Sequence, residues 1–102
     1  MTDPAPGPKV RIEYCTLCHW LLRASWMAQE LLSTFPQDLS EVTLVPGPGG
    51  IFRISLDGEV IWDRKEEHGF PDIAALKQIV RDRVEPDRDL GHIDRSHPRQ
   101  AH

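Results

Sequence analysis

Two cysteines three positions apart are the residues of this sequence best suited to chemistry. Cys15 and Cys18 form a C-x-x-C motif, and they are the only cysteines among the 102 residues. The first residues lack the basic and apolar regions of a secretory signal, so we expect a cytoplasmic protein with reduced thiols. In that compartment such a pair is more often redox-active or metal-binding than structural. The motif therefore predicts thiol–disulfide exchange, in which one thiolate attacks a disulfide and the second thiol resolves the mixed disulfide.

Three other interpretations of the cysteines stay open at this stage. With His19 the pair also spells a c-type haem attachment motif, although haem attachment implies export, and Met27 on the same expected helix would be a poorly placed axial ligand. Zinc would need further ligands, usually four in all, and the other histidines lie at no ligand-like spacing. The third interpretation is a pair of small buried residues without chemistry. We expect no cofactor and no metal.

The residues around the motif predict the elements that position it. Alternating apolar residues predict a strand from Lys9 to Cys15. An apolar stripe then recurs every three or four positions and predicts a helix of about five turns, which Pro36 ends. The stripe consists of Leu17, Leu21, Ala24, Ala28, Leu31 and Phe35. The cysteines would thus lie at a helix N-terminus, where unpaired N–H groups and the macrodipole favour a thiolate.

Three further strands and a second helix complete the expected fold. The expected strands are Glu41–Val45, Ile51–Leu56 and Glu59–Asp63. Asp57-Gly58 is a favoured type I′ hairpin turn, and Asp72 is a good N-cap for a helix that runs to Val84. The order β-α-β-β-β-α indicates a thioredoxin-like α/β fold with a four-stranded mixed sheet in the strand order 2-1-3-4.

Length and composition fit one small domain. Charged residues make up 27% and hydrophobic residues 39%, which is typical of a globular protein. Residues 1–8 and 85–102 lack apolar periodicity, and we expect a flexible lead-in and a polar tail around a domain at 9–84. The net charge of -4 without a basic stripe argues against nucleic-acid binding. The longest uncharged stretch, Thr43–Phe52, contains prolines and glycines and cannot be a membrane span.

A glycine-rich loop is expected beside the cysteines. The two parallel strands end at the same edge of the sheet, so the loop Pro46–Gly50 should lie next to the motif, where its glycines would let a partner backbone approach. The residues that we expect to contact substrate are Thr16, Leu17, Trp20, Pro46, Gly47, Gly49 and Gly50. The alternatives are that the loop is only a tight connection and that Trp20 belongs to the core or shields the thiols.

Several short motifs occur in a fixed order along the chain. They are Ile12-Glu13-Tyr14-Cys15-x-x-Cys18-x-Trp20, Pro46-Gly47-x-Gly49-Gly50, Asp57-Gly58, Trp62-x-Arg64-Lys65 and Gly69-Phe70-Pro71. Over about residues 9–84 this combination resembles the Rdx family of thioredoxin-like proteins, in its selenoprotein W-like branch. The resemblance implies a redox protein whose C-x-x-C is the active site, with glutathione or protein thiols as partners.

The resemblance also bears on the roles of the two cysteines. By position Cys15 matches the invariant thiol and Cys18 matches the selenocysteine of other members. Sulfur is a poorer nucleophile and leaving group than selenium, so the peroxide chemistry of selenium members is not carried over. Thioredoxins attack with the first cysteine, and on that basis we expect Cys15 to attack, whereas the selenium members point to the second position. We expect an oxidoreductase; the alternative is a non-catalytic, redox-sensing protein-interaction module.

Minimal thioredoxin-like domains place both helices on one face of the sheet and leave the other uncovered. The expected hairpin register sets Ile54 opposite Ile61 and Trp62 beside Arg53. Val60 and Trp62 would then point to the uncovered face, where we expect a homodimer or another protein partner. The alternative is an amphipathic face that is partly wetted and partly covered by the tail.

Overall fold

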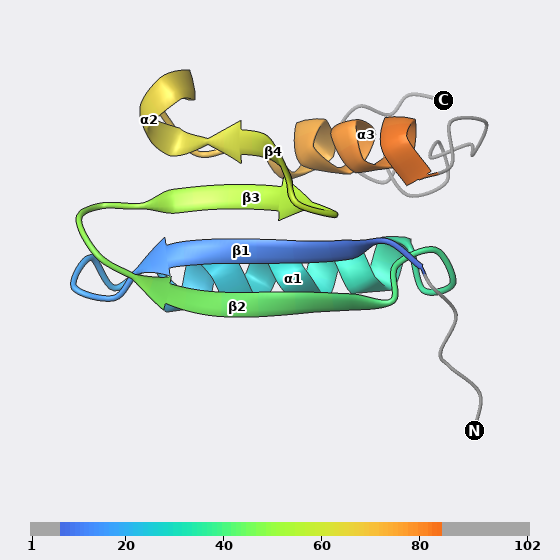
Figure 1. Ribbon diagram of the computed structural model, residues 1–102, viewed down its shortest axis with the longest axis horizontal. Coiled ribbons are helices and arrows are strands. Elements are labelled where there is room, and N and C mark those ends of the chain that lie inside the picture. The colour runs from blue at the N-terminus through green and yellow to red at the C-terminus, as the bar shows by residue number, and fades with distance from the viewer. Residues whose placement is uncertain (1–6, 85–102) are drawn as a thin grey trace.

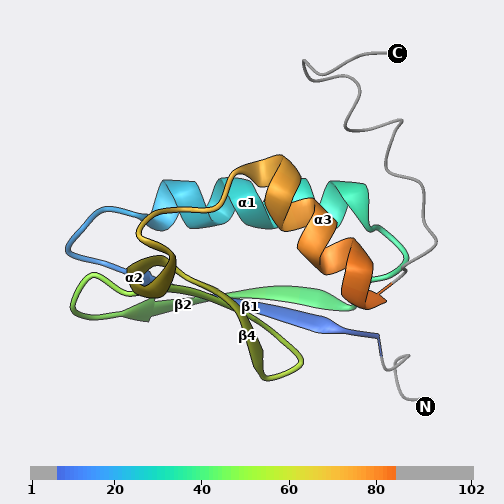
Figure 2. The ribbon, with the colours of Figure 1, turned by 90° about the horizontal axis from the view of Figure 1, so that it is seen from above.

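The computed structural model describes residues 7–84, which form one mixed sheet with two longer helices on the same face (Figures 1 and 2). The elements are β1 (Lys9–Cys15), α1 (Leu21–Thr34), β2 (Glu41–Gly47), β3 (Phe52–Leu56), β4 (Glu59–Asp63), α2 (Arg64–Glu67) and α3 (Ile73–Val84). The expected order of elements is confirmed, with one additional short helix, α2. The expectations for residues 1–6 and 85–102 lie outside the described residues.

The strand order β2-β1-β3-β4 is the one that the sequence predicts. β1 pairs in parallel with β2 and antiparallel with β3, and β3 pairs antiparallel with β4. Because β1 and β2 are parallel, α1 crosses over the sheet between them, as in any βαβ unit. The thioredoxin-like α/β fold is therefore confirmed.

The core lies between the sheet and the two helices. Alternate residues of β1 and β3 point toward the helices, and α1 and α3 each pack one apolar stripe against them. The fully buried side chains include Val10, Ile12, Phe52, Ile54, Met27, Leu31, Leu76 and Val80. The predicted N-cap of α3 is confirmed, because a side-chain oxygen of Asp72 accepts a hydrogen bond from the N–H of Ala75 at 3.3 Å. Within residues 7–84 no helix is long and apolar enough to cross a membrane.

The first helix begins later than the apolar stripe predicts. Residues 16–19 form a turn, and α1 starts only at Leu21. His19 has a positive φ of 61°, a left-handed conformation that interrupts any helix begun at Leu17. Leu17 is consequently 85% exposed instead of belonging to the core. The prediction that the cysteines lie at the start of the helix is wrong, since they lie in the turn before it.

The β3–β4 hairpin contains an irregularity that changes its register. Asp57 and Gly58 both have positive φ, as the predicted type I′ turn requires. Beyond the turn, a shift between Ile54 and Ser55 places Ile54 opposite Trp62 instead of opposite Ile61. The predicted register is therefore wrong: Trp62 shares the face of Ile54 and packs against the core.

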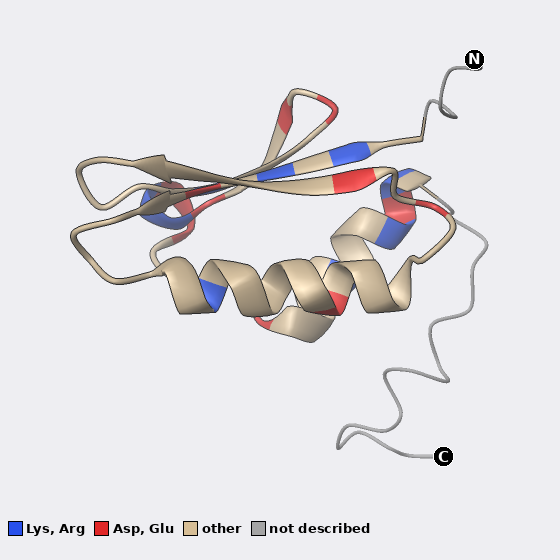
Figure 3. Cartoon of the chain, turned by 90° about the horizontal axis from the view of Figure 1, so that it is seen from below, with Lys and Arg blue, Asp and Glu red and all other residues tan. Residues whose placement is uncertain are grey.

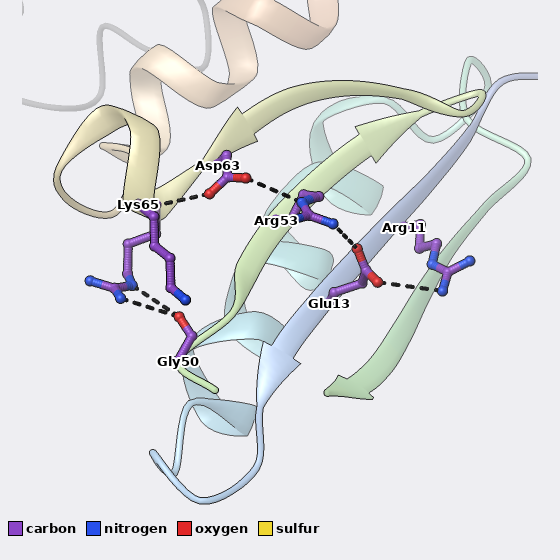
Figure 4. Close-up of polar contacts among 7 residues, drawn as sticks. Arg11, Glu13, Gly50, Arg53, Asp63 and Lys65 are labelled. Carbon is purple, nitrogen blue, oxygen red and sulfur yellow. Dashed lines mark hydrogen bonds and ion pairs between the residues drawn. The ribbon is translucent and has the colours of Figure 1, made fainter. Parts of the chain in front are cut away.

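The uncovered face of the sheet is polar along its centre. Glu13 lies 3.6 Å from Arg53, which also contacts Asp63 at 3.2 Å, and Arg11 lies 3.6 Å from Glu13 (Figure 4). Ion pairs as exposed as these each contribute about 0–1 kcal/mol. Of the two residues expected to form an interface here, Val60 is exposed on this face and Trp62 is not on it. The homodimer stays a prediction, and Trp62 is no longer part of the surface predicted to form it.

Candidate active site

Both cysteines lie at the edge of the sheet where β1 ends. Cys15 is the last residue of β1, and Cys18 belongs to the turn that follows. The N–H of His19 donates to the carbonyl oxygen of Thr16 at 3.1 Å, and the N–H of Trp20 donates to that of Cys15 at 3.5 Å. These bonds close the turn, so the two side chains are brought together while both thiols stay free.

The two sulfurs differ in how accessible they are. Cys15 is 2% exposed, because it is the inward end of a central strand. Cys18 is partly exposed, since the turn carries it out of the sheet. A disulfide that approaches from solvent therefore reaches Cys18 first.

The cysteines share one hydrogen-bonded environment that shifts their pKa values in opposite directions. The hydrogen bond with the side chain of Cys18 is the main cause that lowers the pKa of Cys15; burial opposes it, and backbone hydrogen bonds from Gly50, Cys18 and Leu17 add to it. The same contact raises the pKa of Cys18, as do its burial and the charge of Cys15. Of the two thiols, Cys15 is therefore the one that loses its proton at lower pH, and the pair titrates as a unit.

The loop between β2 and β3 lies against the cysteine turn, as the topology predicts (Figures 1 and 2). Gly47 is the register partner of Cys15, and its carbonyl oxygen accepts a 3.2 Å hydrogen bond from the N–H of Thr16. The backbone of Gly50 provides a hydrogen bond to Cys15. Of the residues expected to contact substrate, Pro46 and Gly49 are exposed at the rim of this loop.

Trp20 belongs to an aromatic cluster and is not a free stacking surface. Its ring meets that of Phe70 edge-on at 4.9 Å and that of Phe52 at 6.2 Å, and the latter two rings lie 5.0 Å apart. Such edge-to-face contacts add about 0.5–1.5 kcal/mol each beyond burial. Trp20 therefore packs beside the site and against the core, in line with the interpretation that it belongs to the core and not to a substrate-contacting surface.

Helix α2 is a part of the site that the sequence analysis missed. It has only four residues, and the expected order of elements contains no helix between the last strand and the helix that follows Asp72. A signal was present: Glu66 follows Asp63 at capping-box spacing, and Gly69 follows the helix. Asp63 accepts a hydrogen bond from the N–H of Lys65 at 3.0 Å, which begins the helix. This turn places Arg64 at the Gly47–Gly50 loop.

An apolar strip adjoins the cysteine turn on its outer side. It consists of Leu17, Leu21, Leu22 and Trp26, all of them exposed. A hollow of about 300 Å³ beside it is lined by Tyr14, Thr16, His19, Leu21 and Leu22. Figure 3 shows that α1 is mostly uncharged, and its only charged residues are Arg23 and Glu30. Exposed apolar side chains gathered in one place are typical of a binding surface.

Metal ligands do not gather around the cysteines. Among residues 7–84 no three His, Cys, Asp or Glu side chains are close enough together to hold a metal ion. The histidines at 92, 97 and 102, for which the sequence shows no ligand-like spacing, lie outside the described residues.

Several known proteins are similar to this chain in sequence or in structure. A structure from Bordetella parapertussis is 60% identical with a TM-score of 0.75, and the match covers 76% of this chain and 99% of that one. A selenoprotein W-related protein from Vibrio cholerae is 46% identical with a TM-score of 0.76, covering 78% and 99% of the two chains. Migration and invasion enhancer 1 of Bos taurus is 28% identical over 97 residues, which cover 95% of this chain and 82% of the relative.

The family itself follows from a match that spans most of the chain. The sequence pattern of the Rdx family fits residues 9–82, from the start of β1 into the last turn of α3. These residues include the C-x-x-C turn, the Gly47–Gly50 loop and α2. The protein therefore belongs to the Rdx family.

Proposed function

We propose that this protein is a thiol–disulfide oxidoreductase that uses Cys15 and Cys18. The observation that carries the proposal is the pair of free, hydrogen-bonded thiols, one with a lowered pKa and the other accessible from solvent. Thiolate is the reactive form in disulfide exchange, and backbone N–H groups that donate to sulfur favour it. This pair has both the stabilised charge and the access that exchange needs.

The burial of the two sulfurs favours Cys18 as the attacking residue, in place of the expected Cys15. Cys15 is covered, so an incoming disulfide cannot align with it. Cys15 accepts the proton of Cys18, and the Cys18 thiolate attacks the substrate disulfide, forming a mixed disulfide and releasing one substrate thiolate. Cys15 then gives up its proton to that leaving thiolate and attacks Cys18, releasing the second. The protein is oxidised to a disulfide, and the substrate is reduced to one thiol and one thiolate, which takes its proton from solvent.

The apolar strip favours a protein disulfide as the substrate over glutathione alone. Leu17 lies between the two cysteines and is 85% exposed, so a chain docked on the strip would present its own disulfide to Cys18. Apolar residues that flank the partner's cysteine would bury Leu22 and Trp26. The same strip would also serve a non-catalytic redox sensor, which is the second candidate function.

Turnover separates these functions. We expect the dithiol to have a reduction potential in the range of about -220 to -320 mV, where the cytosolic glutathione pool lies. We also expect repeated reduction of a protein disulfide when glutathione or a thioredoxin system regenerates the dithiol. The Cys15→Ser/Cys18→Ser double variant is the control. A dithiol that oxidises reversibly but never turns over would support the sensor, and thiols that do not pair would refute both.

A further inference from the structure

Arg64 joins α2 to the loop beside the cysteines. Its Nε and Nη2 donate hydrogen bonds of 3.3 and 3.2 Å to the carbonyl oxygen of Gly50, so two nitrogens of the guanidinium hold one atom. The planar, always charged guanidinium suits this two-point contact, which a lysine ammonium would not reproduce.

Gly50 is the residue that connects this contact to sulfur. Its backbone N–H is one of the groups that lower the pKa of Cys15, and its carbonyl oxygen is the atom that Arg64 holds. Gly50 has φ of +71°, and a glycine in that region is otherwise free to rotate about its own backbone bonds. The two hydrogen bonds to its carbonyl oxygen hold the peptide plane that follows Gly50, and so restrain the end of the Gly47–Gly50 loop beside the cysteines.

Arg64 is itself held in place before any substrate arrives. Its carbonyl oxygen accepts a 3.0 Å hydrogen bond from the N–H of Gly69, which ends α2. The guanidinium carbon lies 4.9 Å from the centre of the Trp20 ring, within the range of a cation–π contact. The guanidinium thus has two partners, the carbonyl oxygen of Gly50 and the ring of Trp20, which keep its charge at the site.

We infer that Arg64 is a positioning residue of the dithiol, which holds the Gly47–Gly50 loop against the cysteine turn and keeps a positive charge beside Cys18. The inference rests on the proposed function, because it assigns a part in generating the thiolate that exchange uses. The charge of Arg64 acts against the other effects that raise the pKa of Cys18. A second cation contacts the aromatic cluster of Trp20, Phe52 and Phe70: the guanidinium carbon of Arg23 lies 3.9 Å from the centre of the Phe70 ring.

The test is the titration of the thiols by ultraviolet absorbance in the absence of any substrate. In Arg64→Gln we expect the titration to move to higher pH and the thiolate fraction at neutral pH to fall about tenfold. Arg64→Lys keeps the charge without the two-point contact and should lie between this variant and the wild type. Arg83→Gln removes an equal charge from the exposed pair with Glu59 and should leave the titration unchanged.

A second variant covers the case in which Arg64→Gln does not fold. A Cβ at residue 50 would lie 3.4 Å from Nη2 of Arg64 on a strained left-handed backbone, so Gly50→Ala should shift the titration in the same direction. An unchanged titration in the folded variants would overturn the role of Arg64, even if the wild type turns over. A shifted titration in a protein without turnover would support the role of Arg64 and refute the oxidoreductase instead.

Discussion

The indole Nε1 of Trp62 donates a 2.9 Å hydrogen bond to the carbonyl oxygen of Gly69, seven residues further along the chain. Trp62 lies near the end of β4, and Gly69 follows α2, so the bond closes the segment that carries Arg64. The same Gly69 donates its N–H to the carbonyl oxygen of Arg64. The geometry of α2 is therefore anchored in the sheet through one side chain.

Replacing Trp62 by phenylalanine should loosen α2 while keeping an aromatic ring in the core. The lost hydrogen bond leaves the carbonyl oxygen of Gly69 without this donor, which costs about 1 kcal/mol of unfolding free energy. We also expect the thiol titration to move to higher pH, by less than in Arg64→Gln. Urea unfolding and thiolate absorbance measure the two effects. Trp26→Phe, on the exposed side of α1, is the control, and equal results for the two variants would contradict this role of Trp62.

Single serine variants should separate the roles of the two cysteines. In Cys15→Ser we expect the accessible Cys18 to trap a mixed disulfide that cannot be resolved, whereas Cys18→Ser should trap little, because Cys15 is 2% exposed. Non-reducing gels and mass spectrometry measure the trapped product.

The pH dependence of alkylation measures the pKa of the remaining thiol when either cysteine is replaced, and so tests the hydrogen bond between them independently. The hydrogen bond with Cys15 raises the pKa of Cys18, so its removal in Cys15→Ser should make Cys18 react at lower pH. The hydrogen bond with Cys18 lowers the pKa of Cys15, so Cys18→Ala, which has no group to donate in its place, should make Cys15 react at higher pH. Preferential trapping through Cys15 would show that the buried sulfur attacks.

The features of this site that the sequence predicts depend on local patterns, and those that it does not predict depend on contacts between residues far apart in the sequence. The alternation in Lys9–Cys15 and the turn chemistry of Asp57-Gly58 are local, and two parallel strands that end together are enough to put the Gly47–Gly50 loop beside the cysteines. Leu17 continues the apolar period of α1 by position alone, and the periodicity cannot reveal that His19 adopts a left-handed conformation.

The hairpin and α2 show why the rest escaped prediction. The two-residue turn fixes Leu56 opposite Glu59, but the shift two residues later is selected by Trp62, which packs in the core and bonds to Gly69. The contact between Arg64 and Gly50 joins residues fourteen apart, so no short motif contains it. Burial of Cys15 and exposure of Cys18 likewise depend on where the turn leaves the sheet.

A buried ion pair links α1 to α3 and should behave asymmetrically on mutation. Lys77 is 2% exposed, and its Nζ lies 2.9 Å from an oxygen of Glu30, whose side chain is about one-third exposed. Glu30→Ala leaves a buried ammonium group without its partner and should cost about 3 kcal/mol of unfolding free energy, whereas Lys77→Met removes the buried charge and should cost little.

Urea unfolding with a linear extrapolation measures both changes. Arg83→Gln breaks a comparable but exposed pair with Glu59 and should change the stability by at most about 1 kcal/mol. A larger loss in Lys77→Met than in Glu30→Ala would show that the lysine is kept for its packing or hydrogen bonds and not because of the buried charge.

Two leucines of α1 test whether the apolar strip binds protein substrates. Leu22 is 81% exposed beside the cysteine turn, and Leu32 is exposed near the far end of the same helix. Leu22→Gln should lower the rate with a protein disulfide, relative to the rate with a small disulfide, about tenfold, since roughly half of a leucine's burial free energy would be lost. Leu32→Gln makes the same chemical change outside the strip and should leave that ratio as it is. If both variants lower the ratio equally, docking is not confined to the strip; if neither does, the substrate contacts only the cysteine turn and the Gly47–Gly50 loop.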